Sequence, residues 1–564
     1  MRRQPGQPAG DRRRTMRITG RVVAALVSIG VVLAGAPAGA GGVVAQRATG
    51  ATPAAAPWLA GVDLERSTVL DLQRAMDGRR LTAAQLTAFY LTRIKRLNPA
   101  LHAVIETNPD APRAAAASDS HRRRHGARSP LEGIPVLLKD NIDTADRQHT
   151  TAGSYALLAS RPARDAHLAA RLRAAGAVLL GKANLSEWAN FRSSDSSSGW
   201  SARGGQGNNP YALDRNPCGS SSGSAQAAAA HLAAVTVGTE TDGSIVCPAG
   251  AQGVVGIKPS LGLVSRAGVV PISAQQDTAG PITRSVTDAA AVLSVLQGVD
   301  ARDPATAAAG PYARRNYLAA LDARALRGKR IGVWRVTGGN AADDAAVRRV
   351  VDDAVRRLRT AGATVVDGLT LPDLDVVNEN EFPALLVEFK HDINAYLAGR
   401  PGPHPGSLAG LIEFNRRFAA LEMRYFGQDI FEAAQRTSGD LTDPTYRRQR
   451  AAATGSAQAA IDTTMARHRL DAIMAPTNGP AWVTDLEDGA DLSGFIGSSG
   501  PAAVAGYPNV TVPAGFAAGV LPLGVSFFGG RWDEPTLVGL AYAFERATAA
   551  RRPPTYLPRV PGGA

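Results

Sequence analysis

The order of apolar and polar residues predicts helices at the start of the globular part of the chain. Between residues 67 and 99, apolar positions recur at helical spacing in two stretches, which indicates two amphipathic helices. We expect Ser67 to cap the first helix and Gly78 to end it. Thr82 should open the second helix, and Pro99 should close it.

Strand signals then alternate with helix signals. Short apolar runs occupy residues 133–140, 177–182, 233–240 and 253–258, and helical stretches separate several of them. Because strands that alternate with helices are typical of α/β proteins, this part of the chain indicates an α/β sandwich.

The rest of the chain keeps this pattern around a helical segment. Residues 328–366 repeat the strand–helix–strand order, residues 375–470 are mostly helical, and apolar strands return after residue 470. Neither an internal repeat nor an interdomain linker interrupts the sequence after residue 57. We therefore predict an α/β fold class with a single large domain over residues 58–560.

The first forty residues have the pattern of a secretory signal peptide. Residues 1–21 are basic, residues 22–35 are apolar, and Ala38, Gly39 and Ala40 form an A-x-A cleavage motif. The apolar stretch is short for a membrane span, and no other segment of the sequence approaches that length. We expect residues 1–40 to be removed on export, residues 41–57 to be a flexible segment, and the mature protein to be secreted or extracytoplasmic.

Several features of this leader leave alternatives open. Arg13 and Arg14 hint at twin-arginine export, and translation could begin at Met16 instead of Met1. Residues 1–40 contribute +6 of the net charge of +13, so the remainder carries +7. The basic cluster at residues 121–128 has no interleaved aromatic residues, so we expect no nucleic-acid partner. Because no segment after the leader approaches a membrane-spanning length, we also expect no stable membrane insertion. The oligomeric state stays open.

The chain has two cysteines, Cys218 and Cys247. Two cysteines cannot form a disulfide framework for 564 residues, although export would permit one bridge. Because the sequence does not supply the geometry of a bridge, the favoured expectation is a pair of buried thiols.

Lysine is rare enough in this chain to be informative. Only six of the 62 basic residues are lysine. Arginine keeps its proton in proteins, whereas a buried lysine can lose it and act as a base. Three lysines end apolar runs near a segment rich in glycine and serine, and any of them could be a base or a structural ion-pair partner: Lys139, Lys182 and Lys258.

The segment rich in glycine and serine allows several interpretations. "GSSSGS", residues 219–224, lacks the spacing of a phosphate-binding loop. It contains the G-x-S-x-G pattern of α/β-hydrolases, but the preceding residues are polar where a nucleophile elbow needs a buried strand. A binding protein without catalysis stays possible. A serine nucleophile with a lysine base is the fourth interpretation, because residues 241–244 form a turn that could direct backbone N–H groups at an oxyanion next to Ser244.

Three motifs together resemble the amidase signature family: "GIPVLLKDNIDT", "PCGSSSGSA" and "GTETDGSIVCPAGAQGVVGIKPS". The likeness runs from about Ser67 to Arg546 and is strongest to bacterial peptide amidases. It implies a mixed β-sheet covered by α-helices on both faces, and hydrolysis of amide C–N bonds through an acyl-enzyme.

The resemblance also assigns roles to residues. It implies a Ser–cis-Ser–Lys triad with Lys139 as base, Ser220 as bridging serine and Ser244 as nucleophile. The peptide bond of Ser220 is expected to be cis. The oxyanion donors would be the N–H groups of Thr241, Asp242, Gly243 and Ser244. Lys182 and Lys258 then become structural residues.

The substrate is less well defined by the sequence. Many family members have arginine at the position of Val246 and glycine at the position of Asp242. The peptide-amidase branch is similar to this chain at both positions. C-terminal peptide amides are the leading expectation; aryl or fatty amides, or a transamidating subunit, are alternatives. We expect no cofactor and no metal, because no cluster has metal-ligand spacing. One wall of the site should come from aromatic residues of the helical segment, unless they are simply core: Phe382, Phe389, Phe414, Phe418, Tyr425 and Phe426.

The surroundings of Lys139 decide whether it can be neutral. Asp140 and Asp143 follow it closely, and a carboxylate beside the amine would hold it protonated. Strand alternation sends Asp140 to the opposite face, so we expect the two not to pair.

Overall fold

The computed structural model describes residues 57–487 and 494–561. The predicted signal peptide, residues 1–40, and nearly all of the predicted flexible segment, residues 41–57, lie outside the described residues.

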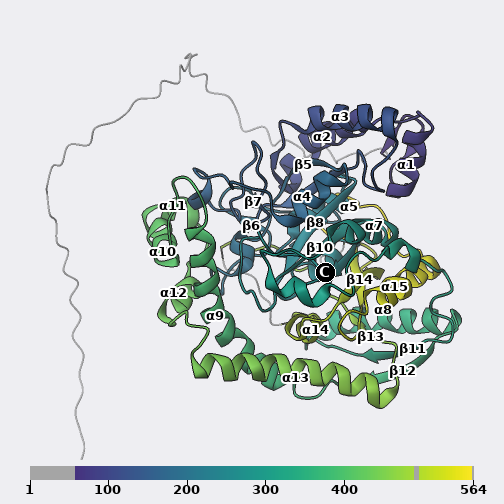
Figure 1. Ribbon diagram of the computed structural model, residues 1–564. Helices are drawn as coiled ribbons and strands as arrows, with labels where there is room; N and C mark the ends of the chain where they lie inside the picture. Colours follow the sequence, from purple (N-terminus) through teal and green to yellow (C-terminus); the bar gives the residue numbers. More distant parts are fainter. Residues whose placement is uncertain (1–56, 488–493, 562–564) are drawn as a thin grey trace, which may run out of the picture. The chain divides into compact units, whose positions relative to one another are not determined.

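A mixed β-sheet is the centre of the fold (Figure 1). In the described part of the chain it has 11 strands. The α/β fold class predicted from the sequence is confirmed. From one edge to the other the strands are β12 (Thr364–Leu369), β11 (Arg330–Trp334), β13 (Ala472–Pro476), β15 (Leu521–Phe528), β14 (Asn509–Ala517), β9 (Val255–Lys258), β10 (Thr278–Thr283), β8 (Val235–Glu240), β4 (Pro135–Lys139), β5 (Val178–Ala183) and β3 (Val104–Thr107).

Parallel pairs and antiparallel pairs both occur in this sheet. Strand β4 lies parallel to β5 and to β8, and β11 lies parallel to β12 and to β13. The remaining neighbours are antiparallel. The four residue pairs β1 (Trp58–Leu59), β2 (Val62–Asp63), β6 (Trp200–Ser201) and β7 (Gly205–Gln206) form two small ribbons, β1 with β2 and β6 with β7.

Helices cover the sheet and form the segment after β12. The helices are α1 (Val69–Asp77), α2 (Ala83–Leu101), α3 (Ala111–His125), α4 (His167–Ala174), α5 (Ser222–Ala229), α6 (Val246–Ala251), α7 (Val286–Leu296), α8 (Ala341–Thr360), α9 (Leu374–Ala398), α10 (Leu408–Arg417), α11 (Ala419–Glu422), α12 (Asp429–Arg436), α13 (Pro444–His468), α14 (Gly500–Ala505) and α15 (Glu534–Thr548). Helices α9 to α13, green in Figure 1, make up the predicted helical segment, which we call the insert.

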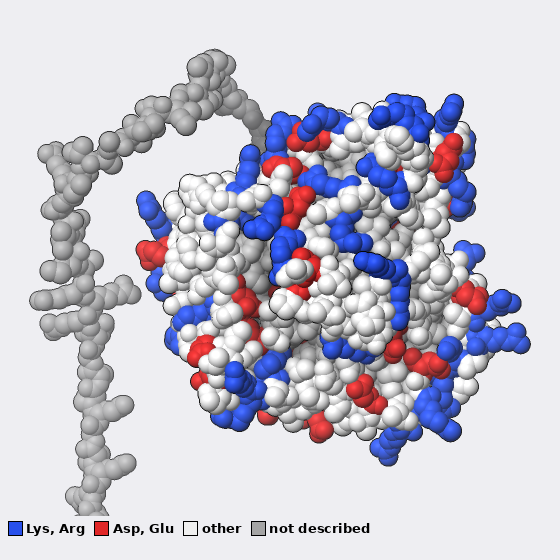
Figure 2. All heavy atoms as spheres, in the orientation of Figure 1, with Lys and Arg blue, Asp and Glu red and all other residues white. Residues whose placement is uncertain are grey.

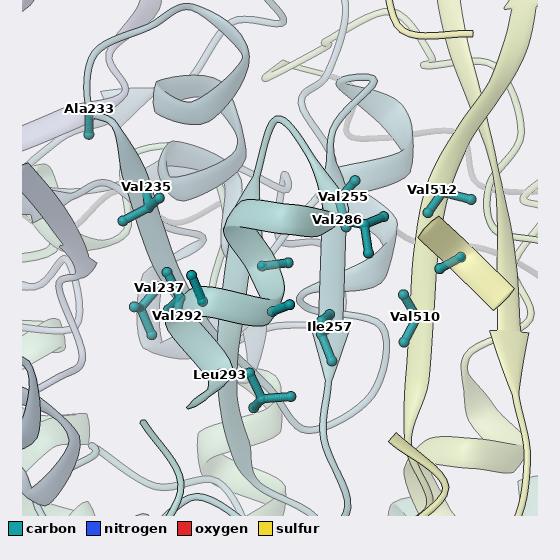
Figure 3. Packing of buried hydrophobic residues seen from close by; sticks show 14 of the residues in the cluster. Ala233, Val235, Val237, Val255, Ile257, Val286, Val292, Leu293, Val510 and Val512 are labelled. Atoms are coloured by element: carbon teal, nitrogen blue, oxygen red, sulfur yellow. The ribbon is translucent and has the colours of Figure 1, made fainter. Parts of the chain in front are cut away.

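The core lies where the central strands meet the helices. Every residue of β8 and β9 is buried, in agreement with the lack of a polar–apolar alternation in these strands. Figure 3 shows valine and isoleucine side chains of β8, β9 and β14 gathered beside Val292 and Leu293 of α7. Burial of this set removes a large apolar area from water, which is the main stabilising contribution to folding.

Two predicted helix ends differ from the structure. The N-cap of α1 is Thr68 and not Ser67, because the Thr68 hydroxyl accepts from the Asp71 N–H while the Asp71 carboxylate accepts from the Thr68 N–H. Helix α2 begins after Thr82 as predicted but continues past Pro99 to Leu101. A proline near the end of a helix removes only one N–H donor, and His102 closes the helix in the left-handed conformation.

Charges of both signs are mixed on the visible surface. On the face shown in Figure 2, lysine and arginine side chains are scattered among acidic and uncharged residues. Among the described helices, none is long and apolar enough to cross a bilayer.

Candidate active site

Lys139 is the last residue of β4, and the parallel neighbour β8 ends one residue before Thr241. Because the carboxyl ends of parallel neighbours meet at the same edge of a sheet, the Lys139 side chain and the turn after β8 lie close together. The side chain of Lys139 is fully buried. Its Nζ lies 2.9 Å from Thr239 Oγ1 and 3.2 Å from the Thr239 carbonyl oxygen on β8.

Ser220 lies in the loop before α5. The Gly219–Ser220 peptide bond is cis, as the family resemblance implied. The Ser220 carbonyl accepts a hydrogen bond from the Ser186 N–H at 3.0 Å, and the neighbouring Ser221 N–H donates to the Ser244 carbonyl at 3.0 Å. The first bond attaches the loop to the segment after β5, and the second attaches it to the turn that carries Ser244.

Ser244 lies in the turn between β8 and α6. Gly243 has φ of +75°, a conformation that a residue with a side chain rarely adopts. The Glu240 carboxylate accepts from the N–H groups of Ile245 and Val246, at 2.8 and 3.0 Å, and so closes the turn from behind. Asp277 accepts from the Thr241 hydroxyl at 2.6 Å.

A hydrogen-bonded chain joins the three side chains singled out from the sequence. Lys139 Nζ lies 2.7 Å from Ser220 Oγ, and Ser220 Oγ lies 2.9 Å from Ser244 Oγ. Hydroxyl hydrogens rotate, so the chain can conduct a proton from Ser244 towards Lys139 once the lysine is neutral.

Burial lowers the pKa of Lys139 to about 7 from its ordinary value, and the charges of Asp277 and Glu240 offset part of this effect. The charged form is disfavoured because the amine has lost its water. In the described part of the chain, no carboxylate lies within ion-pair distance of Lys139. At neutral pH a substantial fraction of this lysine is therefore unprotonated.

The two nearby carboxylates face other partners. Asp140 lies 3.8 Å from an Arg203 nitrogen, and Asp143 lies 3.6 Å from an Arg400 nitrogen and accepts from the Tyr396 hydroxyl at 2.9 Å. Neither carboxylate pairs with Lys139, and for Asp140 this agrees with the prediction from strand alternation.

The other two candidate lysines occupy different surroundings. Lys182 is buried, and its Nζ donates to Thr150 Oγ1 at 2.9 Å. Burial lowers the pKa of Lys258 to about 8, and the charges of Glu240 and Glu534 oppose that shift. The structure brings Lys139, and neither of these lysines, within hydrogen-bond distance of Ser220.

The backbone of residues 241–244 lines a cavity of about 360 Å³. Within the described chain, these four residues donate no backbone hydrogen bond to another backbone carbonyl. The N–H groups of Thr241, Asp242, Gly243 and Ser244, which the resemblance implied as oxyanion donors, are thus not among the backbone donors to backbone carbonyls, and their residues line the cavity. Ser220 also lines it, so the hydrogen-bonded chain opens to this space.

Apolar side chains that the sequence did not single out form much of the cavity wall. They are Phe191, Ile272, Leu385, Trp482 and Phe495. The expectation that aromatic residues of the insert form a wall is wrong for the described residues, because the insert contributes Leu385 alone. The six proposed aromatic residues lie elsewhere: Phe389 is in the core, and Phe382 contacts Phe191 from outside the cavity. No sequence signal separates Leu385 from the other apolar positions of α9.

Cys218 and Cys247 form a disulfide, which corrects the expectation of two buried thiols. Their Cα atoms are 6.1 Å apart across a sequence separation of 29 residues. The contact arises because the loop before α5 packs on the turn before α6, a tertiary arrangement that residue spacing does not encode.

The central serine of the G-x-S-x-G pattern, Ser221, does not face the cavity. Its hydroxyl donates to the Thr239 carbonyl at 2.9 Å, inside the protein. The described residues hold no group of three or more histidine, cysteine, aspartate or glutamate side chains with the geometry of a metal site.

Comparison with known proteins finds relatives that cover most of this chain. The Amidase family matches residues 85–538. A probable amidase of Arabidopsis thaliana is 44% identical over 504 residues, covering 88% of this chain and 92% of the relative. A glutamyl-tRNA(Gln) amidotransferase component of Halorhodospira halophila is 32% identical over 493 residues, covering 86% of this chain and 98% of the relative.

Two solved structures of peptide amidases are similar to this chain in both sequence and fold. The native peptide amidase of Stenotrophomonas maltophilia is 50% identical, with a TM-score of 0.83, covering 87% of this chain and 99% of that chain. A peptide amidase in complex with the competitive inhibitor chymostatin is 51% identical with the same TM-score and coverage. The chain therefore belongs to the amidase signature family. It is an amidase, which excludes the interpretation as a passive binding protein.

Proposed function

We propose that this protein is an exported serine amidohydrolase that removes the C-terminal amide of peptides. The observation that carries the proposal is the chain of hydrogen bonds from Lys139 through Ser220 to Ser244, at the edge of the cavity that residues 241–244 line. Each part of this arrangement has a place in amide hydrolysis.

The first half of the reaction forms an acyl-enzyme. Neutral Lys139 takes a proton from Ser220 while Ser220 takes the proton of Ser244, and Ser244 Oγ attacks the amide carbonyl carbon. The negative charge that develops on the carbonyl oxygen is stabilised by the N–H groups of residues 241–244. Collapse of this intermediate breaks the C–N bond, and Lys139 returns the proton through the Ser220 hydroxyl to the leaving ammonia or amine, because Ser244 Oγ now carries the acyl group.

The second half of the reaction uses water. A water molecule attacks the ester of Ser244 and gives a proton to the same chain, and the ester bond breaks as Ser244 recovers its proton. The products are a carboxylic acid and ammonia or an amine, and the enzyme returns to its starting protonation state. No step needs a metal or a cofactor.

Peptide amides are the favoured substrate for two reasons. The cavity joins apolar walls to a backbone that offers several N–H groups, which suits the last residue of a peptide. The two peptide amidase structures match this chain at 50% and 51% identity. Aryl and fatty amides are the alternatives within hydrolysis.

Transamidation is the second candidate, since components of glutamyl-tRNA(Gln) amidotransferases are among the relatives. Such a reaction needs a partner and an amine acceptor. The purified chain alone should instead release ammonia from a peptide amide at multiple turnover, with water as the acceptor.

A fluorophosphonate probe tests the nucleophile. Wild-type protein should be labelled on Ser244, found by mass spectrometry, and Ser244→Ala should not be labelled. A panel of peptide, aryl and fatty amides then ranks the substrates by kcat/KM. Labelling of another serine, or turnover of aryl or fatty amides only, would overturn the corresponding part of the proposal.

Export is tested separately on the full chain. Mass spectrometry of protein recovered outside the cytoplasm should find a new N-terminus between about residues 36 and 50, allowing for ambiguity of the cleavage site. A mature protein that keeps Met1 or Met16 would contradict export with cleavage.

A further inference from the structure

The disulfide lies next to the two serines of the hydrogen-bonded chain. Cys218 is two residues before Ser220, and Cys247 is three residues after Ser244. These are the two cysteines of the chain, and the bond joins the two segments that must hold the serine hydroxyls together.

Besides this bond, hydrogen bonds connect the two segments at two places. The Gln252 side chain, just after α6, donates to the carbonyls of Pro217 and Ser222 at 2.9 and 3.3 Å. The Ser221 N–H donates to the Ser244 carbonyl at 3.0 Å, and the two hydroxyls of Ser220 and Ser244 share the 2.9 Å hydrogen bond. The backbone at Cys218 has φ of +54°, which is uncommon for a residue with a side chain. Because a hydrogen bond weakens as its donor and acceptor move apart, a separation of the segments by a fraction of an ångström would weaken the bond between Ser220 and Ser244 that carries the proton.

The same disulfide is part of the cavity wall. Cys218 and Cys247 both line the cavity, and Trp482 packs against them. Both cysteines are largely buried, so the cavity is the route by which a small thiol reagent would reach the sulfur atoms in folded protein.

We propose that the Cys218–Cys247 disulfide is a positioning element of the active site, so that the oxidised protein is the active form. The bond holds the loop of Ser220 against the turn of Ser244, and its reduction lowers the rate of acylation. This inference rests on the proposed roles of the two serines. It also means that a chain still in a reducing compartment has low amidase activity and gains full activity after the cysteines are oxidised.

The redox step is an ordinary thiol–disulfide exchange. A dithiothreitol thiolate attacks one sulfur and forms a mixed disulfide, and the second thiol of the reagent displaces the cysteine. Two electrons and two protons end on Cys218 and Cys247, and the reagent becomes a cyclic disulfide. In the reverse direction a disulfide oxidant accepts the two electrons.

The first experiment reduces folded protein with dithiothreitol under native conditions and follows the thiols by titration. When two thiols appear, kcat for a peptide amide should fall by about 10- to 100-fold, the range expected when reacting groups are displaced by up to about 1 Å. KM should change little, because the rest of the cavity is unaltered. Reoxidation by oxidised glutathione should restore kcat.

Near-ultraviolet circular dichroism of the same samples separates positioning from global stability. Its spectrum should stay native, at a temperature well below the unfolding transition of the reduced protein. A fall in kcat that matches a loss of native spectrum would overturn the inference, since the bond would then only stabilise the fold.

The Cys218→Ser/Cys247→Ser double variant provides the matched control. It should show the low kcat of the reduced wild type and no response to dithiothreitol. Wild-type kcat in this variant, or full activity of reduced folded wild type, would overturn the inference. If the double variant does not fold, the reduced wild type decides the question alone. An oxidised wild type that hydrolyses no amide would instead contradict the proposed function.

Discussion

At the scale of single residues, Lys139 is distinguished by a buried amine that has hydroxyl partners and no ion-pair partner in the described structure. It is fully buried beside Thr239 and Ser220, without a carboxylate at ion-pair distance in the described structure. A lysine in such a place is a poor structural cation and a suitable base, because the neutral amine is the form that burial favours.

The pH dependence of the reaction should report this lysine. Its pKa is lowered to about 7, mainly by burial, and the neutral form is the active one. The value of kcat/KM should therefore fall tenfold per pH unit on the acid side of about pH 7 and level off above it. Measurement of kcat/KM from pH 5.5 to 9 checks this. A flat profile across that range would exclude Lys139 as the titrating base.

Substitution of Lys139 should show that the proton matters more than the charge. Lys139→Arg and Lys139→Ala should both lose about 10²- to 10⁴-fold in kcat, because arginine keeps its charge but does not accept a proton. Lys329→Arg is the matched control, since Lys329 is a partly exposed lysine paired with Asp471. If Lys139→Arg kept most of the rate and Lys182→Ala abolished it, Lys182 would be the base.

The residue scale also shows where sequence reasoning stops. Scarcity of lysine reduced the possible bases to three, and all three proved to be buried. Composition and spacing alone do not choose among them. The family resemblance selected Lys139, and the fold gives the physical reason, because the pairing of β4 with β8 brings this lysine to the serines. The disulfide was missed for the same reason: two cysteines separated by 29 residues approach each other through packing and not through any local pattern.

At the scale of elements, the short helix α5 sets the position of Ser220. All eight of its residues are buried. Gly223 lies in its first turn, and its N–H donates to the Asn184 carbonyl at 3.0 Å. A Cβ atom at this position would meet the backbone of Ala103 and Asn184 well inside van der Waals contact. The helix can lie this close to β3 and β5 only because residue 223 has no side chain.

Gly223→Ala should therefore damage the site through the helix. We expect a loss of about 1–3 kcal/mol in unfolding free energy from overpacking, and a fall in kcat on the order of 100-fold as α5 and Ser220 shift. Gly455→Ala on α13 is the control. Its Cβ would meet nothing within 4 Å, so stability should rise by up to about 1 kcal/mol with kcat unchanged. Denaturant unfolding and kcat are measured on both; equal behaviour of the two variants would contradict this account.

Element types were easier to predict than the surfaces they present. Period and apolar runs gave the strand–helix order, and also the helices of the insert, because these depend on local spacing. The start of α1 and the end of α2 were displaced by one or two residues, because Thr68 rather than Ser67 forms the capping box and Pro99 is tolerated in the last turn before His102. The wall of the cavity could not be predicted, since which face of α9 meets the site depends on tertiary packing.

At the scale of the whole molecule, the reaction is expected to need nothing that the chain does not carry. Activity should survive dialysis against EDTA, because protons and the acyl group pass between protein side chains, substrate and water alone. The measurement is kcat before and after treatment, with addition of zinc or magnesium as the control. Loss in EDTA followed by recovery with a divalent ion would contradict the proposed mechanism.

The placement of the insert limits how far its exchange can alter the substrate cavity. Helices α9 to α13 leave the sheet after β12 and return at β13, two strands at the far end from β4 and β8, and they contribute Leu385 to the cavity. Most of the apolar wall, Phe191, Ile272, Trp482 and Phe495, therefore belongs to the part of the chain that also carries the triad. A designer who exchanges the insert between relatives would reach the admitted acyl group through position 385 alone, and larger changes of preference have to be made beside the atoms that break the bond.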